Sequence, residues 1–478
     1  MITKRHACCI LGAGPAGCGA AVELTRHGVK DLIIVDRNGV VGGLSRTEQI
    51  GDCRFDIGPH RFFTRNAEID RLWHATLGTD FIPVKRRTRV YYDSAFFNYP
   101  LSAVDALKKL KPGDGLRAVL SFAASRLRRR RHEADNFEDW IVDRFGDVLY
   151  RTFFKSYTEK VWGIPCRRRS ADWAAQRIQD LDLLKLLRNA LPGGRQDRAK
   201  TLIDRFEYPA DGSGQMYAAL CAGVVAAGGS VLLGADVRKI GRNGTRIESV
   251  EVACADGSSC RIEAGHFFSS LPLTHVFERL DPPEDKTVTD AAGALHYRDH
   301  ITVNLAVGGR NPFPDQWIYI HAPEVRMARL TNYNNFSPRM SGSAETWALS
   351  AEYFAAHDEP LWRRPDGEMV ALATEEAASL GVIKPGAVLQ AHVTRETEAY
   401  PEYEVGYAKP LAVLRGHIGA YSNLTTMGRG GLFKYNNQDH SLYSGLLAAR
   451  NLLKLEGAPY DLWAINNDAQ YLEMRRAP

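Results

Sequence analysis

The chain opens with an order of apolar and turn-forming segments that predicts a strand, a helix and a second strand. The apolar run His6–Leu11 is followed by a glycine-rich turn, a helical stretch that ends near Gly28, and a second apolar run, Asp31–Val35. Short apolar runs bounded by glycine are typical of buried strands, and the spacing between them is typical of a helix. The pattern therefore predicts a βαβ unit at the amino terminus.

Further along the chain the hydrophobic pattern changes character. Residues 100–200 carry helical spacing, in the segments Leu101–Leu110, Gly115–Leu127, Phe137–Phe145 and Trp173–Leu191. Strand patterns return at Ser230–Leu233, Val237, Ile247–Cys254, Arg261–Ile262 and His266–Ser270. Residues 290–400 then combine strands (Ile301–Val307, Trp317–Ile320, Thr346–Tyr353 and Val388–Arg395) with a helix at Asp366–Leu380, and a last helix is predicted over Asp439–Leu455. The pattern predicts an α/β chain with a helical and a sheet-rich insertion.

The turn after the first strand has the spacing of a dinucleotide-binding loop. It reads Gly12-Ala-Gly14-Pro-Ala-Gly17, and Asp36 closes the second strand. The first glycine of such a loop permits the tight turn, the second lets the backbone approach a pyrophosphate, and the third allows close packing of helix and strand. The helix amino terminus offers N–H groups to the phosphates, and the acid is placed to accept from a ribose hydroxyl. We therefore expect a bound dinucleotide here.

Composition and charge argue against several other classes of protein. The 478 residues are 45% hydrophobic and 24% charged, as in a globular chain, and no apolar run approaches the ~20 residues of a membrane span. The net charge of +5 gives no general case for nucleic acid binding. Eight cysteines are too sparse for a disulfide framework or a zinc site, so no metal is predicted and a reducing cytoplasm is the expected compartment. For the basic run Arg126–Arg131, a solvated helix end is favoured over contact with a membrane or nucleic acid.

Two segments after the βαβ unit indicate which dinucleotide is bound. Val41–Thr47, with its Gly42-Gly43 pair, and Phe55–Phe62 follow the acid, and consecutive glycines expose N–H groups to a flat ring or a phosphate. This arrangement resembles the FAD-binding amino-terminal region of flavoproteins such as amine oxidases, protoporphyrinogen oxidase, phytoene desaturases and UDP-galactopyranose mutase. The resemblance implies FAD, with NADPH or NADH as a candidate reductant. The predicted cofactor contacts are Gly12, Gly14, Ala16, Gly17, Asp36, Arg37, Gly43, Leu44, Ser45, His60, Val237, Gly428, Asn437 and Ser441.

Three later segments resemble the UDP-galactopyranose mutase family more narrowly. They are Ser156–Gly163, Ala328–Phe336 and Gly428–His440. The resemblance implies a role for each residue at a matching position: Trp162 would line the sugar pocket, Phe153 and Tyr157 would enclose the nucleotide base, Arg329 and Tyr435 would hold the diphosphate, Arg177 would lie by the sugar and phosphate, and His60 would lie beside the flavin. A diphosphate favours guanidinium donors, and a base favours aromatic faces. His60, Arg177 and Arg329 are the predicted catalytic residues.

The resemblance also implies an architecture and a reaction. A discontinuous Rossmann-like FAD-binding domain, made of residues 1–95, 205–290 and 400–478, would be interrupted by a helical lobe, 96–204, and a sheet-rich substrate-binding lobe, 291–399. The implied enzyme acts on a nucleotide-diphosphate sugar, as a pyranose/furanose ring-contraction mutase with N5 of reduced flavin as nucleophile. An FAD-dependent oxidoreductase of the protoporphyrinogen oxidase or amine oxidase type stays open as the alternative, and a homodimer is a candidate assembly.

The chain departs from the mutase pattern at three places. Phe63 stands where mutases carry a second histidine, Asp180–Leu187 is acidic and leucine-rich instead of basic, and Leu191–Lys200 is an insertion at the place of a mobile lid. Because of these departures, the sequence does not identify the sugar or the base of the substrate.

Overall fold

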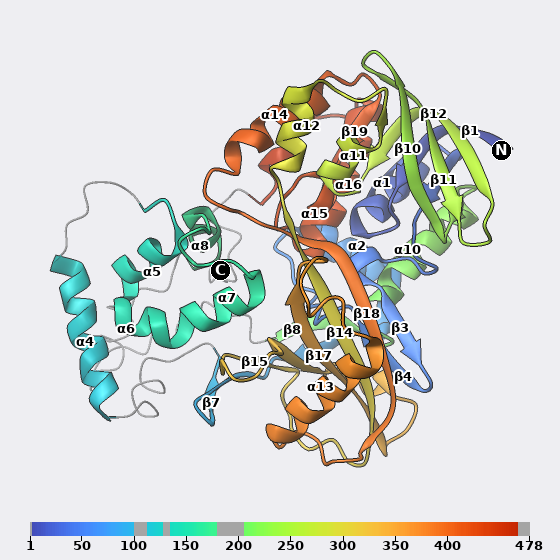
Figure 1. Cartoon of the computed structure of the whole chain (residues 1–478). Coiled ribbons are helices and arrows are strands. Elements are labelled where there is room, and N and C mark those ends of the chain that lie inside the picture. Colours follow the sequence, from blue (N-terminus) through green and yellow to red (C-terminus); the bar gives the residue numbers. More distant parts are fainter. Residues whose placement is uncertain (1, 100–111, 128–133, 179–204, 467–478) are drawn as a thin grey trace.

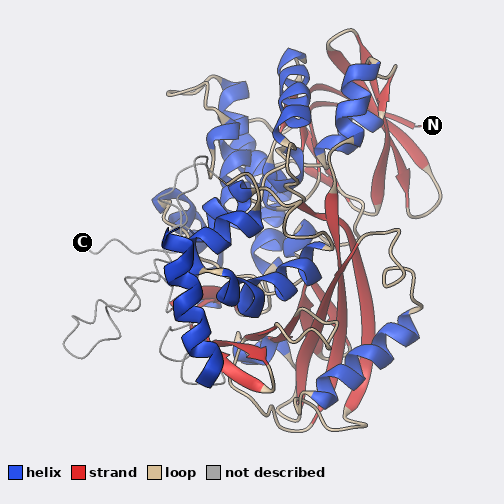
Figure 2. Cartoon of the chain, turned by 60° about the vertical axis from the view of Figure 1, so that its left-hand side comes forward, coloured by secondary structure: helices blue, strands red, loops and turns tan. Residues whose placement is uncertain are grey.

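The computed structural model describes residues 2–99, 112–127, 134–178 and 205–466. Its two large sheets lie one above the other in Figure 1, and a group of helices stands to their left. Figure 2 shows the same arrangement turned, with the helices in front of the strands.

The first sheet contains the predicted βαβ unit. Its strands run in the order β13 (Leu280–Asp281), β10 (Ala235–Asn243), β11 (Arg246–Cys254), β12 (Ser259–Ser269), β1 (Ile2–Leu11), β2 (Leu32–Val35) and β9 (Ser230–Leu232), and β19 (Leu424–Thr426) pairs with β12. The pairs β1–β12, β1–β2, β2–β9 and β12–β19 are parallel, whereas β10–β11 and β11–β12 are antiparallel. The helix α1 (Pro15–Arg26) connects β1 to β2.

Helices cover both faces of this sheet. Cys8 and Ile10 of β1 belong to one core, with α1, α10 (Gly214–Ala226) and α16 (Gln438–Leu453). Cys9 and Leu11 belong to the opposite core, with α11 (Leu273–Glu278), α12 (Lys286–Gly293) and α14 (Ala408–Ala420). Because successive side chains of a strand point to opposite faces, a continuous apolar run is what a strand buried on both sides requires.

The second sheet is mostly antiparallel. Its order is β18 (Val388–Pro401), β14 (Tyr297–Gly308), β17 (Thr346–Ala355), β16 (Arg329–Asn332), β15 (Trp317–Ile320), β6 (Thr88–Tyr92) and β7 (Ala95–Asn98). The helix α13 (Asp366–Ser379) packs on it. Residues 88–98 thus pair with strands of the predicted substrate lobe, although the resemblance assigns residues up to 95 to the cofactor domain. Local periodicity says nothing of the distant partner of β6, which is β15.

The helical lobe consists of α4 (Pro112–Leu127), α5 (Phe137–Phe145), α6 (Asp147–Leu149), a π-helical turn (Tyr150–Lys155), α7 (Ser156–Trp162) and α8 (Ala171–Ile178). It has a small core of its own, built on Phe137, Trp140, Ile141, Phe145 and Tyr150. The predicted helix Leu101–Leu110, most of the predicted helix Trp173–Leu191, the acidic segment Asp180–Leu187 and the insertion Leu191–Lys200 lie outside the described residues.

Smaller elements complete the chain. β3 (Thr47–Ile50) and β4 (Cys53–Asp56) form a hairpin, β5 (Phe81–Lys85) pairs with β8 (Arg205–Pro209), and α2 (Ala67–Leu77) precedes β5. One strand prediction is corrected: Arg261–Ile262 and residues 266–269 of the predicted strand His266–Ser270 belong to a single strand, β12, because β1 pairs along most of its length. Among the helices that the structure describes, none is both long and apolar enough to span a bilayer.

Candidate active site

The turn after β1 is held open by glycine. Gly12 has a φ of +106°, and a Cβ built on it would lie 2.1 Å from Oγ of Ser270. A Cβ on Gly17 would lie 1.8 Å from the carbonyl oxygen of Gly12, so only glycine lets α1 begin this close to β1. No side chain caps the start of α1, which leaves its first N–H groups for a ligand.

Three glycine segments that are far apart in the sequence meet at this turn. A Cβ on Gly43 would lie 3.1 Å from Cα of Gly14, and a Cβ on Gly428 would lie 2.8 Å from Cβ of Ala16. We call Gly12, Gly14, Gly17, Gly43 and Gly428 the glycine cradle. Because these glycines have no side chains, an extended dinucleotide can approach their backbone closely.

Asp36 lies at the end of β2, where the sequence places it. Its Oδ2 accepts from the N–H of Ala13 at 2.7 Å, and its Oδ1 accepts from the N–H of Asn38 at 2.8 Å. Burial raises the pKa of Asp36, against the opposing effect of these N–H groups and of Arg37. Each carboxylate oxygen keeps a further lone pair, which suits a ribose hydroxyl.

A pocket lies along the glycine cradle. Among the predicted contacts it is lined by Gly12, Gly14, Ala16, Asp36, Arg37, Gly43, Leu44, Ser45, His60, Val237, Gly428 and Ser441. Gly17 packs beneath the turn, and Asn437 is occupied as the cap of α16 in a reciprocal pair with His440. The pocket is also lined by Gly430, two residues after Gly428. Sequence reasoning missed other lining residues: Ser270, His275, Arg279, Arg429 and Asn436. No local spacing marks these five residues.

His60 is a neutral acceptor in the pocket wall. Its Nε2 lies 2.8 Å from the carbonyl oxygen of Leu44 and 3.2 Å from that of Ile57, and because carbonyls only accept, Nε2 carries the proton. Burial, together with the charges of Arg429 and Arg329, lowers the pKa of His60 to about 4. Near neutral pH, Nδ1 therefore has no proton.

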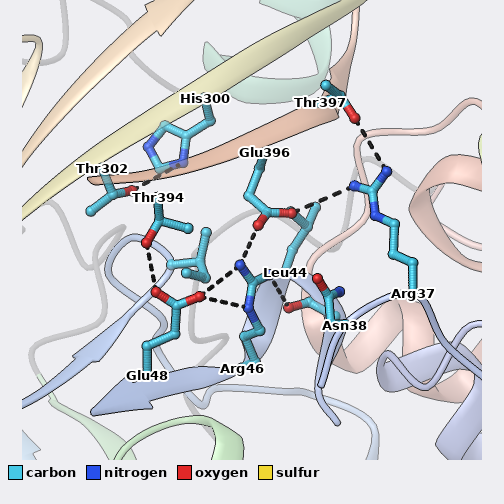
Figure 3. A network of polar contacts seen from close by, with 12 residues as sticks. Arg37, Asn38, Leu44, Arg46, Glu48, His300, Thr302, Thr394, Glu396 and Thr397 are labelled. Atoms are coloured by element: carbon cyan, nitrogen blue, oxygen red, sulfur yellow. Dashed lines mark hydrogen bonds and ion pairs between the residues drawn. The ribbon is translucent and has the colours of Figure 1, made fainter. Parts of the chain in front are cut away.

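A polar network ties the Gly42-Gly43 loop to the second sheet (Figure 3). The buried guanidinium of Arg46 donates through Nε to Glu48 at 3.0 Å and through Nη2 to Glu396 of β18. Burial alone would lower the pKa of Arg46, but Glu396 and Glu48 raise it. Glu396 also faces Arg37 at 3.7 Å. These ion pairs hold the Gly42-Gly43 loop against β18 of the second sheet.

Three aromatic side chains gather beside the pocket. Tyr400 and Tyr435 stack with ring centroids 5.4 Å apart, and the ring of Trp162 lies 6.2 Å and 6.4 Å from them. We call these three residues the aromatic cluster. The guanidinium of Arg429 lies over Tyr400 and Tyr435, at 5.0 Å and 5.1 Å. The structure thus brings together the predicted Trp162 and Tyr435, and adds Tyr400 from the end of β18.

Arg329 is paired with an acid. It lies on β16 directly opposite Glu352 of β17, and donates through Nε to Oε1 at 2.7 Å and through Nη2 to Oε2. Glu352 is fully buried and also accepts from Thr331 at 2.9 Å and contacts Nε2 of His300 at 3.0 Å. Burial raises the pKa of Glu352, but Arg329 and His300 outweigh it and hold the pKa at about 2. The charge of Arg329 is therefore balanced, and Nη1 is the nitrogen without a bond to Glu352.

Arg169, which sequence reasoning missed, is fully buried against two tryptophans. Its guanidinium carbon lies 3.4 Å from the ring centre of Trp162 and 4.4 Å from that of Trp173. None of its three side-chain nitrogens has a hydrogen-bond partner among the described residues. Burial lowers the pKa of Arg169 to about 9, and Glu402 opposes that effect most strongly.

The other predicted substrate residues are Phe153, Tyr157 and Arg177. Phe153 packs against Phe97 and Tyr92, with centroids 5.8 Å and 5.9 Å away, as a core residue does. The ring of Tyr157 is stacked on His321, at 4.3 Å and an interplanar angle of 13°, so protein covers one of its faces. Arg177 lies on α8, but its side chain is outside the described residues. The roles of these three residues stay predictions.

Comparisons with known proteins agree with this geometry. The family described as flavin containing amine oxidoreductase matches residues 15–409. dTDP-fucopyranose mutase of Escherichia coli is 27% identical over 159 residues, which are 32% of this chain and 41% of that protein. A probable UDP-galactopyranose mutase of Klebsiella pneumoniae is 28% identical over 162 residues, 32% of this chain and 40% of that protein. The chain thus spans about two fifths of the length of these two relatives.

Other similarities extend over nearly the whole chain. Coproporphyrinogen III oxidase of Mycobacterium tuberculosis is 23% identical over 434 residues, 86% of this chain and 90% of that protein. The solved structure of a reduced UDP-galactopyranose mutase matches with a TM-score of 0.83 at 21% identity, over 98% of both chains. A putative protoporphyrinogen oxidase from Exiguobacterium sp. matches with a TM-score of 0.69 at 16% identity, over 95% of this chain and 99% of that chain. At these identities the structural likeness speaks for the fold, and the predicted α/β class is confirmed.

Proposed function

We propose that this chain, which belongs to the family of flavin-containing amine oxidoreductases, is an enzyme acting on a nucleotide-diphosphate sugar. Its proposed reaction is that of a pyranose/furanose ring-contraction mutase. FAD is its cofactor, and the glycine cradle has the open backbone that a dinucleotide requires. When bound, FAD supplies a nucleophile in its reduced form or a hydride acceptor in its oxidised form. The choice between these two chemistries depends on what the chain binds beside the flavin.

One observation carries the proposal: two guanidinium groups border the aromatic cluster without an ion-pair partner among the described residues. Arg169 lies on Trp162, and Arg429 lies over Tyr400 and Tyr435 while donating only to backbone carbonyls. A positively charged amine would be repelled by this pair, whereas a diphosphate would be attracted and could accept from both. This supports an anionic substrate over the amine that the family description names.

The free-energy cost of burying the charge of Arg169 also favours an anionic substrate. A cation–π contact between desolvated groups is worth about 2 kcal/mol, while an unpaired charge in the interior costs several kcal/mol. Stacking on Trp162 and Trp173 therefore offsets only part of the cost of burying Arg169. A bound anion would supply the rest by accepting hydrogen bonds from the guanidinium.

The other residues of the site then have limited tasks. Tyr435 can donate its hydroxyl to a phosphate oxygen, and Trp162 with Tyr400 can exclude water from the sugar. Arg329, locked to Glu352, offers the diphosphate one nitrogen in a fixed orientation. His60 keeps its proton on Nε2 toward Leu44, so near neutral pH it is placed to accept a hydrogen bond and not to protonate a leaving phosphate.

An oxidoreductase that acts on a carboxylate-bearing substrate is the second candidate. The similarity to coproporphyrinogen III oxidase covers 86% of this chain, far more than the matches to the two mutases. Unpaired guanidinium groups would serve carboxylates as well as phosphates, so the charge pattern alone does not separate the two reactions.

The test is the oxidation state in which the enzyme works. We would incubate the FAD-loaded protein, either reduced with dithionite or oxidised in air, with UDP- and dTDP-linked hexoses, and follow pyranose-to-furanose conversion by chromatography and oxygen uptake by electrode. The proposal predicts conversion by the reduced protein only, with no net oxygen consumption. Turnover confined to the oxidised protein, with oxygen uptake, would overturn it in favour of the second candidate.

A matched pair of variants connects the activity to the site. Tyr435→Phe is expected to weaken conversion because it removes a hydroxyl from the aromatic cluster. Tyr443→Phe removes a hydroxyl from α16, outside the lining of the pocket, and is expected to behave as wild type. Equal effects of the two variants would argue against the aromatic cluster as the substrate site.

A further inference from the structure

The short helix α7 carries two of the predicted substrate residues, Tyr157 and Trp162. Their rings contact residues from outside the helical lobe: Tyr157 stacks on His321, and Trp162 lies beside Tyr400. In Figure 1, α7 lies on the side of the helical lobe that faces the second sheet. The contacts that hold α7 against this sheet therefore also determine where the two substrate side chains lie.

Lys160, between these two residues on α7, donates to three backbone carbonyls. Its Nζ lies 2.9 Å from the carbonyl oxygen of Ile320, 2.8 Å from that of Ala322 and 3.3 Å from that of Met327. Ile320 ends β15, and the other two lie in residues 321–328, which we call the β15–β16 loop. An ammonium group has three N–H donors, so these carbonyls use all of them. Lys160 thus joins α7 to the β15–β16 loop.

The β15–β16 loop leads directly to a third predicted substrate residue. Its N–H groups are also held: Glu376 of α13, which is buried, accepts through Oε2 from the N–H of Met327 at 3.0 Å. The N–H of Ala328, the last residue of the loop, donates to the carbonyl oxygen of Glu352 at 2.8 Å. Arg329 follows on β16 and pairs with the carboxylate of the same Glu352. The carbonyls that Lys160 holds therefore belong to the segment that places Arg329.

Both ends of α7 are fastened to the second sheet as well. At its start, Oγ of Ser156 donates to the carbonyl oxygen of His321 at 3.3 Å. Near its end, Nε of Arg298, on β14, donates to the carbonyl oxygen of Val161 at 3.1 Å. Lys160 adds a charged connection between these two neutral acceptor contacts, and charge-assisted hydrogen bonds are the stronger kind.

We propose that Lys160 is a positioning residue for substrate binding, which keeps Tyr157 and Trp162 of α7 at a fixed place relative to Arg329. The inference rests on the proposed function, because these three residues are the ones proposed to contact the nucleotide sugar. A lysine close to a diphosphate would ordinarily be expected to bind the phosphates directly. The three carbonyl acceptors argue against that role, since they occupy the donors that a phosphate would need.

The charge of Lys160 makes this connection sensitive to pH. Burial lowers the pKa of Lys160 to about 8, and Glu376 of α13 and Glu324 of the loop oppose that effect. His321 is neutral near pH 7, because burial and the charge of Lys160 lower its pKa to about 3. As the pH rises through 8, the ammonium becomes an amine with two donors for three carbonyls. The connection between α7 and the loop is therefore expected to weaken above pH 8.

Hydrogen exchange followed by mass spectrometry tests the connection without any substrate. We would compare the FAD-loaded wild type with Lys160→Met, which keeps an unbranched stem but removes the donors. Exchange in peptides that cover residues 156–162 and 321–328 is expected to be about tenfold faster in the variant, with unchanged exchange in the first sheet. The matched control is Lys155→Met, because Lys155 is exposed just before α7; it is expected to exchange as wild type.

Equilibrium dialysis with UDP- and dTDP-linked hexoses tests the consequence for the substrate. Affinity is expected to fall about tenfold in Lys160→Met and to stay at the wild-type value in Lys155→Met. FAD content is expected to be normal in both, since neither lysine lines the cofactor pocket. Wild-type affinity is also expected to fall between pH 7 and pH 9. Titration of Arg169 acts in both proteins, so the part of this fall that is absent in Lys160→Met belongs to Lys160.

Three results would overturn the proposal. They are unchanged exchange in both segments of Lys160→Met, lower affinity with unchanged exchange, which would assign Lys160 to direct substrate contact, and faster exchange with wild-type affinity. If Lys160→Met does not fold, Lys160→Gln, which keeps two N–H donors, is expected to show the same effects at a smaller size. A wild type that binds no nucleotide sugar, with faster exchange in the variant, would overturn the proposed function and still support the connection through Lys160.

Discussion

The glycine cradle and the aromatic cluster adjoin each other but are built by different means. The cradle is made of backbone: its positions are set by turns that no Cβ could enter, as at Gly12 and Gly17. The aromatic cluster is made of side chains from α7, β18 and the segment after α15 (Gly428–Gly431). Arg329 is likewise held through its side chain, by a cross-strand pair with Glu352. A site built from backbone is disrupted when one added atom occupies its space. A site built from side chains is disrupted when one of the interacting side chains is removed.

The largest effect is expected from adding a methyl group to the cradle. In Gly17→Ala the new Cβ would lie 1.8 Å from the carbonyl oxygen of Gly12, a backbone atom that cannot turn aside. Overpacking of this kind costs about 1–3 kcal/mol or more, and we expect the purified variant to contain almost no FAD. The ratio of flavin to protein absorbance measures this.

Gly14→Ala is the matched comparison for Gly17→Ala, because it adds the same methyl group where the protein has room for it. Its Cβ would lie 3.7 Å from the nearest atom, Cα of Gly43, so the protein itself can accommodate it. We expect the free energy of unfolding of the cofactor-free protein to stay at the wild-type value, and any loss of FAD to come from contact with the cofactor. Full FAD content in Gly17→Ala would show that the cradle is not limited by its backbone.

The next effect is expected on the side-chain site. Arg329→Met leaves the buried Glu352 without its cation, and breaking a buried pair in this way costs about 3–5 kcal/mol of unfolding free energy, measured by urea denaturation. Arg329→Met/Glu352→Gln is expected to recover most of that stability while substrate affinity stays low, and FAD content is expected to be normal in both. A single variant as stable as wild type would show that the pair contributes little.

A pH titration tests the same pair with a smaller effect. The folded pKa of Glu352, about 2, lies below its ordinary value of 4.5. The carboxylate therefore adds stability that is fully present above pH 4.5 and is lost as the pH falls through 2. This corresponds to about 3 kcal/mol, and the difference in unfolding free energy between wild type and Glu352→Gln should shrink by that amount. A difference that does not change with pH would contradict the assigned pairing.

The smallest effect is expected at Arg169. Arg169→Met keeps an unbranched apolar stem against Trp162 but removes the charge, and we expect affinity for the nucleotide sugar to fall about tenfold, measured by equilibrium dialysis. Its neighbour Arg168 is 62% exposed and pairs with Glu404 at 2.8 Å, so Arg168→Met is the control with little change. Reduced stability of Arg169→Met with normal affinity would assign Arg169 to packing alone.

The same contrast explains what could be predicted from the sequence. A backbone site leaves a local signal, because glycines at fixed spacing are required where φ is positive or helix and strand approach closely, as at Gly12 and Gly43. The βαβ unit, the cofactor pocket and Asp36 therefore follow from short segments. Asn437, which the resemblance places at the cofactor, is the N-cap of α16, and its contact with FAD stays a prediction.

A side-chain site leaves no such signal. Glu352 is 23 residues from Arg329 and meets it only because β16 and β17 pair in one register. Arg169 is the last of three consecutive arginines, and only the fold sends it inward while Arg168 stays at the surface. Phe153 matches a family position and packs against Phe97 in a small core. Local resemblance alone does not fix the direction of a side chain, so its role at the nucleotide base stays a prediction.

The crossing of the first and last long helices has a consequence for how the protein is made. A Cβ on Gly445 of α16 would lie 2.0 Å from the carbonyl oxygen of Ala16, and Gly428, just before α16, lies on the same turn of α1. On the ribosome, the residues that begin the cradle emerge some four hundred residues before those that finish it. We therefore expect FAD binding only after residue 428 has been synthesised, and a chain that ends before α15 is expected to purify without the absorbance of FAD.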